Sequence, residues 1–97
     1  MAQVARRAQL QPRIDRYLDN LMRTWESIPF DAQEWAGWDD LSQLTYVVNW
    51  PVNEDQLHML AQWAEQGLLA PEQRARYDEL LQLVERHRPL LEELLKE

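Results

Sequence analysis

The chain has 97 residues, no cysteine and a net charge of −7. A chain of this length forms a single domain with one modest core. Without cysteine it cannot form disulfides, thiolate metal sites or iron–sulfur clusters, so we expect a protein of the reducing cytoplasm. No apolar run approaches the roughly 20 residues of a membrane-spanning helix, and no membrane association is expected.

The charge is distributed unevenly along the chain. Residues 1–25 carry a net charge of +3, residues 26–70 one of −8, and residues 71–97 one of −2. The middle segment has no lysine or arginine, yet it holds four of the five tryptophans. Nucleic-acid binding requires a basic patch, so direct binding of DNA or RNA is not expected. An acidic, tryptophan-bearing surface suits a basic partner protein, and the alternative is that the charge only maintains solubility.

We predict an all-α fold, a small bundle of four to five helices, because the chain has two glycines and few β-branched residues. The first helix should have Pro12 in its first turn and end before Pro29. Residues 1–11 form either a short turn of helix or a frayed N-terminal arm of the single domain. One apolar stripe of this helix faces the core and consists of Ile14, Tyr17, Leu18, Leu21, Met22, Trp25 and Ile28.

A short helical turn is expected over residues 30–38, with Gly37 as its terminator. Asp39 or Asp40 would then cap a second short helix over residues 41–48. That segment contains the only β-like run of the chain, so an extended conformation stays open for it.

Two longer helices are expected in the second half of the chain. The first follows a break at residues 49–51 and runs from the N-cap Asn53 to Gly67. Pro71 opens the second at its first position. The apolar phase of this last helix continues across Pro89, which predicts one amphipathic helix with a proline kink.

The last helix is long for a domain of this size. Its 27 residues would span about 40 Å, whereas twice the radius of gyration of a 100-residue domain is about 26 Å. We therefore predict a homodimer in which the end of this helix meets a second chain. The predicted dimerisation residues are Leu83, Leu90, Leu91, Leu94 and Leu95. The alternative is that the first helix covers them.

Tryptophan dominates the candidate binding surface, because its large rigid side chain is enriched in interface hot spots. Trp63 follows Met59 at four-residue spacing on the flank of its helix, and we expect it in a surface patch. For Trp35 and Trp38, both a position in the core and a position in the binding surface stay open. The predicted partner-binding residues are Trp35, Trp38, Asp39, Asp40, Trp50, Met59 and Trp63.

No pattern in the chain indicates catalysis. The Asp39-Asp40 pair lacks the further carboxylates of a metal or acid–base site, and helix capping accounts for it. His58 has one possible co-ligand in Glu54, whereas a metal ion needs at least one more. The chain also lacks a nucleophile with a base at plausible spacing and a phosphate-binding loop. We therefore expect no enzyme, no cofactor and no metal.

The segments Gly67–Gln73, Arg76–Leu81 and Arg88–Leu95 resemble the C-terminal part of short bacterial helical proteins, some of toxin–antitoxin type. Ala70 stands where those proteins usually have a capping serine or threonine, and the first two thirds of the chain show no such similarity. The resemblance covers about 30 residues and identifies no functional residue.

The sequence favours a small acidic interaction or regulatory module that binds a basic partner protein, with antitoxin-like neutralisation as one version. A nucleic-acid mimic that inhibits a DNA- or RNA-handling enzyme is an alternative. A non-catalytic minor subunit of a larger complex is another.

Overall fold

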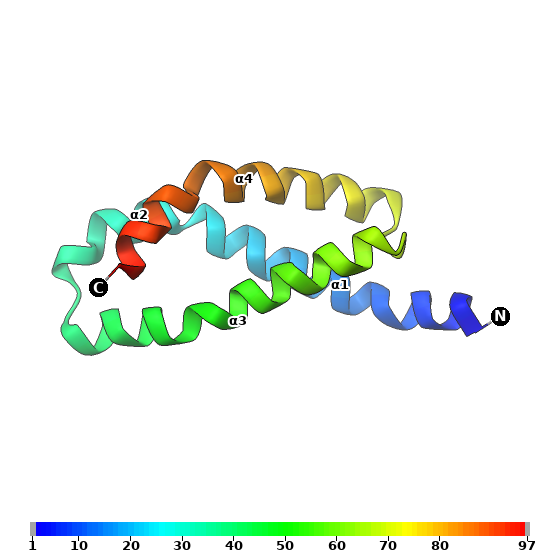
Figure 1. The fold of residues 1–97 in the computed structure, drawn as a ribbon, viewed down its shortest axis with the longest axis horizontal. Helices are drawn as coiled ribbons and strands as arrows, with labels where there is room; N and C mark the ends of the chain where they lie inside the picture. The colour runs from blue at the N-terminus through cyan, green and yellow to red at the C-terminus, as the bar shows by residue number, and fades with distance from the viewer. Residues whose placement is uncertain (1, 97) are drawn as a thin grey trace.

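The structure is a computed structural model that describes residues 2–96, with side chains from residue 8 onward. It contains α1 (Ala2–Glu26), α2 (Ile28–Glu34), the 3₁₀ turn η1 (Trp35–Gly37), α3 (Asp40–Glu65) and α4 (Pro71–Leu95) (Figure 1). The prediction of a small all-α bundle is confirmed, with four α-helices and no strand within residues 2–96.

The first helix begins earlier than predicted. α1 starts at Ala2, so the segment that was open between a helical turn and a frayed arm belongs to this helix. Pro12 lies inside the helix, which corrects its expected place in the first turn. Because Pro12 has no backbone N–H, the carbonyl group of Ala8 lacks its helical partner. Pro12 is exposed, so this carbonyl group can bind water. Ser27 alone separates α1 from α2, and Pro29 lies in the first turn of α2.

The break predicted at residues 49–51 is wrong, because α3 continues through Pro51. Contacts on the inner side of the helix hold the turns before and after the proline together. Tyr46 and Trp50 stack with ring centroids 5.7 Å apart, and the Trp50 indole donates a hydrogen bond to Glu54 at 3.0 Å. Residues 41–48, for which an extended conformation was open, are therefore helical.

The ends of α3 follow the sequence closely. The Asp39 carboxylate accepts a hydrogen bond from the backbone N–H of Ser42 at 2.8 Å, so the predicted N-cap is confirmed. At the other end Gly67 has a φ of 73°, and the N–H of Leu68 donates to the carbonyl of Trp63 at 2.9 Å. This positive φ favours glycine, which explains why the helix stops there.

α1 packs against both α3 and α4, and the core follows its apolar stripe. The largest fully buried side chains are Ile14, Leu18, Leu21, Trp25, Ile28, Leu60, Leu80 and Leu91. Because three helices of 25 or 26 residues run along one long axis, the molecule is slender and measures 52 × 23 × 17 Å (Figure 1).

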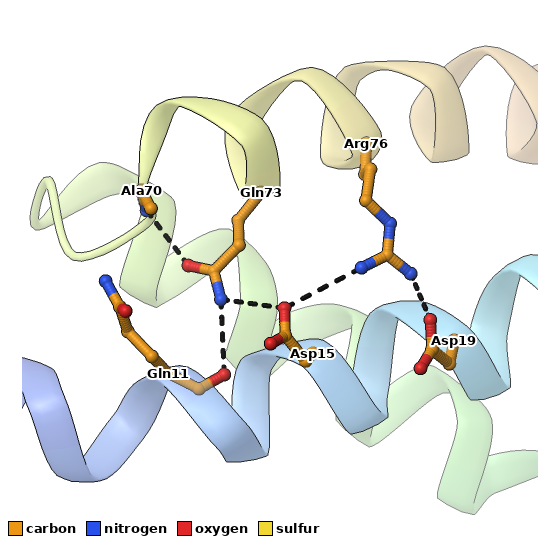
Figure 2. A network of polar contacts seen from close by, with 6 residues as sticks. All are labelled: Gln11, Asp15, Asp19, Ala70, Gln73 and Arg76. Carbon is orange, nitrogen blue, oxygen red and sulfur yellow. Dashed lines mark hydrogen bonds and ion pairs between the residues drawn. The ribbon is translucent and has the colours of Figure 1, made fainter.

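A polar network joins the start of α4 to α1, and Figure 2 shows its members Gln11, Asp15, Asp19, Ala70, Gln73 and Arg76. Gln73 is only 5% exposed, and its amide nitrogen donates to the Gln11 carbonyl at 3.2 Å and to Asp15 at 2.9 Å. Its amide oxygen accepts the N–H of Ala70 at 2.9 Å, so Gln73 caps the helix that Ala70 itself cannot cap. Arg76 pairs with both aspartates at the surface, where ion pairs contribute little.

No helix within the described residues is both long enough and apolar enough to cross a bilayer.

Gln73→Ala is expected to lower the free energy of unfolding by about 1 kcal/mol, because it removes the part-buried hydrogen bonds that join the start of α4 to α1. Urea unfolding followed by circular dichroism measures the effect. Gln82→Ala, at an exposed position of the same helix, is the matched control and should change little. Equal stability of the two variants would contradict a structural role for Gln73.

Candidate partner-binding surface

The three long helices meet at Trp25 of α1. Its buried ring meets the ring of Trp50 of α3 edge-on, with centroids 5.4 Å apart, and the guanidinium of Arg88 of α4 lies 5.2 Å from its centroid. Arg88 also pairs with Glu54 at 3.1 Å, and the same carboxylate oxygen accepts the Trp50 indole N–H. Trp50 is therefore fixed on the inner side of α3.

A row of aromatic rings continues from this junction to η1. Trp50 stacks on Tyr46, and Tyr46 meets Trp35 and Trp38 edge-on at 5.3 and 5.7 Å. The side-chain amide of Gln43 donates to the carbonyl of Trp35 at 2.7 Å, which ties η1 to α3. Trp35 and Trp38 are half-buried, so each combines contacts within the chain with a surface that stays accessible.

The expected surface position of Trp63 is wrong. Trp63 is only 6% exposed and stacks on Tyr17 of α1 with centroids 5.5 Å apart. α1 covers the flank of α3 that carries Trp63, which the periodicity of α3 alone does not reveal. Trp50 is also a core residue, at 4% exposure. We therefore do not include these two tryptophans in a proposed binding surface.

The other predicted binding residues lie at two places along α3. Asp39 and Asp40 are exposed at its start, where hydrogen bonds from the side chain and backbone of Ser42 lower the pKa of Asp39. Met59 is half-buried and lines a hollow of about 380 Å³ to which α1 contributes Arg13. The arginine makes that hollow unsuited to a basic partner.

The leucines predicted to form a dimer contact the core of their own chain. Leu91 and Leu94 are buried, and Leu83, Leu90 and Leu95 are half-buried and pack against the core cluster. α1 and its neighbours thus cover much of the leucine side of α4. This is the alternative that the sequence left open. A homodimer through the remaining leucine surface stays a prediction.

A different group of apolar side chains is left uncovered on α3. Leu41, Leu44, Val48 and Val52 are 71%, 58%, 62% and 57% exposed. Their spacing of three and four residues places them on one side of the helix, opposite Tyr46 and Trp50. We call these four residues the α3 outer face. The sequence did not reveal these four residues as one apolar stripe, because the break expected at residues 49–51 placed Val52 outside the helix of the other three.

The α3 outer face is uncharged but acidic at both ends. Residues 41–53 contain no Asp, Glu, Lys, Arg or His. Asp40 precedes this segment and Asp55 follows it, and both are exposed. No lysine or arginine occurs anywhere between residues 26 and 70, so no cation of α3 offsets these carboxylates.

A hollow of about 180 Å³ lies beside this face, between η1 and α3. It is lined by Trp35, Asp40, Gln43, Leu44 and Val47. Leu44 belongs to both the hollow and the α3 outer face, so the two form one continuous surface. Indole and aliphatic walls with a single carboxylate favour an apolar side chain accompanied by a cation.

The described residues bring together no group of three or more histidine, aspartate or glutamate side chains that could hold a metal ion. Scans against protein-family models, curated proteins and solved structures find no match to this chain. The interpretation of the surface therefore depends on its own geometry and charge.

Trp63→Ala is expected to lower the free energy of unfolding by roughly 3 to 5 kcal/mol, because it leaves a cavity between α1 and α3. Val52→Ala, on the exposed side of the same helix, is the control and should change stability by less than about 0.5 kcal/mol. Urea unfolding compares them, and a loss for Trp63→Ala as small as the control would place Trp63 outside the core.

Tyr46 should make stability fall at alkaline pH. Burial raises the pKa of its hydroxyl well above the usual value of 10.0, and the carboxylate of Asp31 acts in the same direction. The contribution to stability is complete below about pH 10 and is lost as the pH rises through the pKa of the folded state. Tyr46→Phe should therefore lose less stability than the wild type between about pH 8 and about pH 11, as measured by urea unfolding. Equal losses would contradict this.

Proposed function

We propose that this protein is a small acidic interaction or regulatory module that binds a basic partner protein through the α3 outer face. The observation that carries the proposal is the exposure of Leu41, Leu44, Val48 and Val52 on one side of a helix that has no cation. Contiguous exposed apolar surface of this kind marks interaction sites in soluble proteins.

Charge and apolar area have separate roles in this proposal. The carboxylates around the α3 outer face attract a basic protein and raise the rate of association, an effect that salt weakens. Burial of the four aliphatic side chains then stabilises the complex, at about 25 cal/mol per Å² of apolar surface removed from water. Trp35, which lines the hollow beside Leu44, supplies rigid aromatic contact area.

One version of this function is antitoxin-like neutralisation of a basic enzyme. A second candidate is a non-catalytic subunit of a larger complex, which the same exposed apolar surface favours, because permanent partners cover such surfaces. A nucleic-acid mimic would present carboxylates along a face, whereas residues 41–53 are uncharged.

Two further features belong to this proposal. We place the protein in the cytoplasm because it has no cysteine to form a disulfide. α4 continues through Pro89 as one helix, and we propose that it bends there, because the proline removes one helical hydrogen bond. The half-buried leucines beyond this bend remain candidates for self-association.

The test is affinity capture from the native cell extract with the full chain as bait. We expect a basic protein to be retained at low salt, to be weakened at high salt, and to be lost with the bait Leu44→Gln/Val48→Gln. Both positions are exposed, so the substitutions should change stability little, and glutamine leaves the net charge unchanged.

Leu81→Gln is the matched control bait, because Leu81 is an exposed apolar residue of α4 and lies outside the α3 outer face. It should retain the same protein as the wild type. If no basic protein is retained, or if the Leu44→Gln/Val48→Gln bait retains it equally well, the proposed function is wrong.

A further inference from the structure

We infer that the α3 outer face receives one amphipathic helix of the partner, with an apolar seam of about three turns and a lysine or arginine at each end. This inference rests on the proposed function and specifies the segment that binds. Three observations carry it: α3 is covered on one side only, most of its backbone groups are already used within the helix, and its carboxylates lie at the two ends of the outer face.

The N-terminal half of α3 is apolar on two opposite sides. Tyr46 and Trp50 face the bundle and take part in the aromatic row, while the α3 outer face lies on the other side. An apolar side of a helix is normally buried against another element, so two apolar sides call for two covers. Within the described residues this segment is covered on its inner side only, so a second element is required on the outer side.

The occupant must satisfy its own backbone hydrogen bonds. Apart from the carbonyl of Val47, which Pro51 leaves without its helical partner, the backbone groups of this part of α3 are used within the helix. Thr45, which lies among the residues of the outer face, donates its hydroxyl to the carbonyl of Leu41 at 2.8 Å. An extended or irregular segment laid on this surface would bury polar groups without partners. A helix satisfies them internally, and its side chains can pack between those of Leu44 and Val48.

The length of the face sets the length of the helix. Leu41 and Val52 are eleven residues apart, which corresponds to about 17 Å along the helix axis. A partner helix that presents apolar residues at three- and four-residue spacing over about three turns would cover this distance. The hollow beside Leu44 adds room for one bulky apolar side chain of the partner.

The carboxylates exclude a second copy of this chain as the occupant. Asp40 and Asp55 lie fifteen residues apart at the two ends of the face, about 22 Å along the axis. If two copies packed through this face, in either orientation, carboxylates would meet carboxylates. No lysine or arginine between residues 26 and 70 could relieve the repulsion. A partner with a cation at each end of its seam matches the charge at both positions.

The experiment uses the full chain and labelled synthetic peptides of 18 residues. The test peptide has leucines at three- and four-residue spacing and two lysines at each end. A scrambled peptide keeps the composition but loses the apolar seam, and a third peptide has glutamates in place of the lysines. Fluorescence anisotropy gives each dissociation constant, and circular dichroism reports helix formation by the peptide.

We expect the test peptide to bind at least about tenfold more tightly than either other peptide and to become helical on binding. Leu44→Gln/Val48→Gln should weaken it about tenfold or more, and Leu81→Gln should leave it unchanged within about twofold. A second, independent variant, Asp40→Asn/Asp55→Asn, should weaken the lysine peptide and improve binding of the glutamate peptide.

Equal binding of the scrambled peptide would overturn the inference, because charge alone would then account for recognition. Failure of the test peptide to bind would also overturn it. Sedimentation equilibrium measures the mass of the free protein in solution. If Leu44→Gln/Val48→Gln lowers this mass, a second copy covers the face. If the peptides fail, capture of a basic protein that is lost with the Leu44→Gln/Val48→Gln bait would still uphold the proposed function, so the two failures are distinguishable. A second copy on the face would count against the proposed function as well.

Discussion

The arrangement of this protein depends on the junction at Trp25, where α1, α3 and α4 meet. The indole ring contacts Trp50 on one helix and Arg88 on another, and Arg88 and Trp50 share the carboxylate of Glu54. These contacts fix the rotation of α3 about its axis. Once Trp50 points inward, Tyr46 follows it into the aromatic row, and the side of α3 that carries Leu44 must face away from the bundle.

The slender shape has a direct consequence for the exposed apolar surface. Three helices of 25 or 26 residues lie along an axis of 52 Å, and the molecule is only 17 Å thick in its shortest dimension. In so thin a bundle a helix can be covered on one side and left open on the other. The C-terminal half of α3 has α1 against its flank at Trp63, whereas the outer side of its N-terminal half has no cover within the described residues.

Sequence reasoning was accurate where the local chemistry of the chain decides the outcome. The cap at Asp39, the stop at Gly67, the start of α4 at Pro71 and the apolar stripe of α1 all depend on neighbours within a few residues. It was wrong at Pro51, because contacts of Trp50 and Tyr46 on the inner side preserve a helix that a proline alone would weaken. That error also hid the stripe that ends at Val52.

The sequence by itself determined that the chain is helical, that its middle segment is acidic without cations, where α3 begins and ends, and where α4 begins. These properties follow from residue type and short-range spacing. Only the tertiary structure decided which tryptophans are buried and which apolar side chains stay exposed. Periodicity shows that a helix has an apolar side, but the packing of other helices determines whether that side is covered. Trp63 is buried because α1 lies over it, and Val48 is exposed because no described segment does.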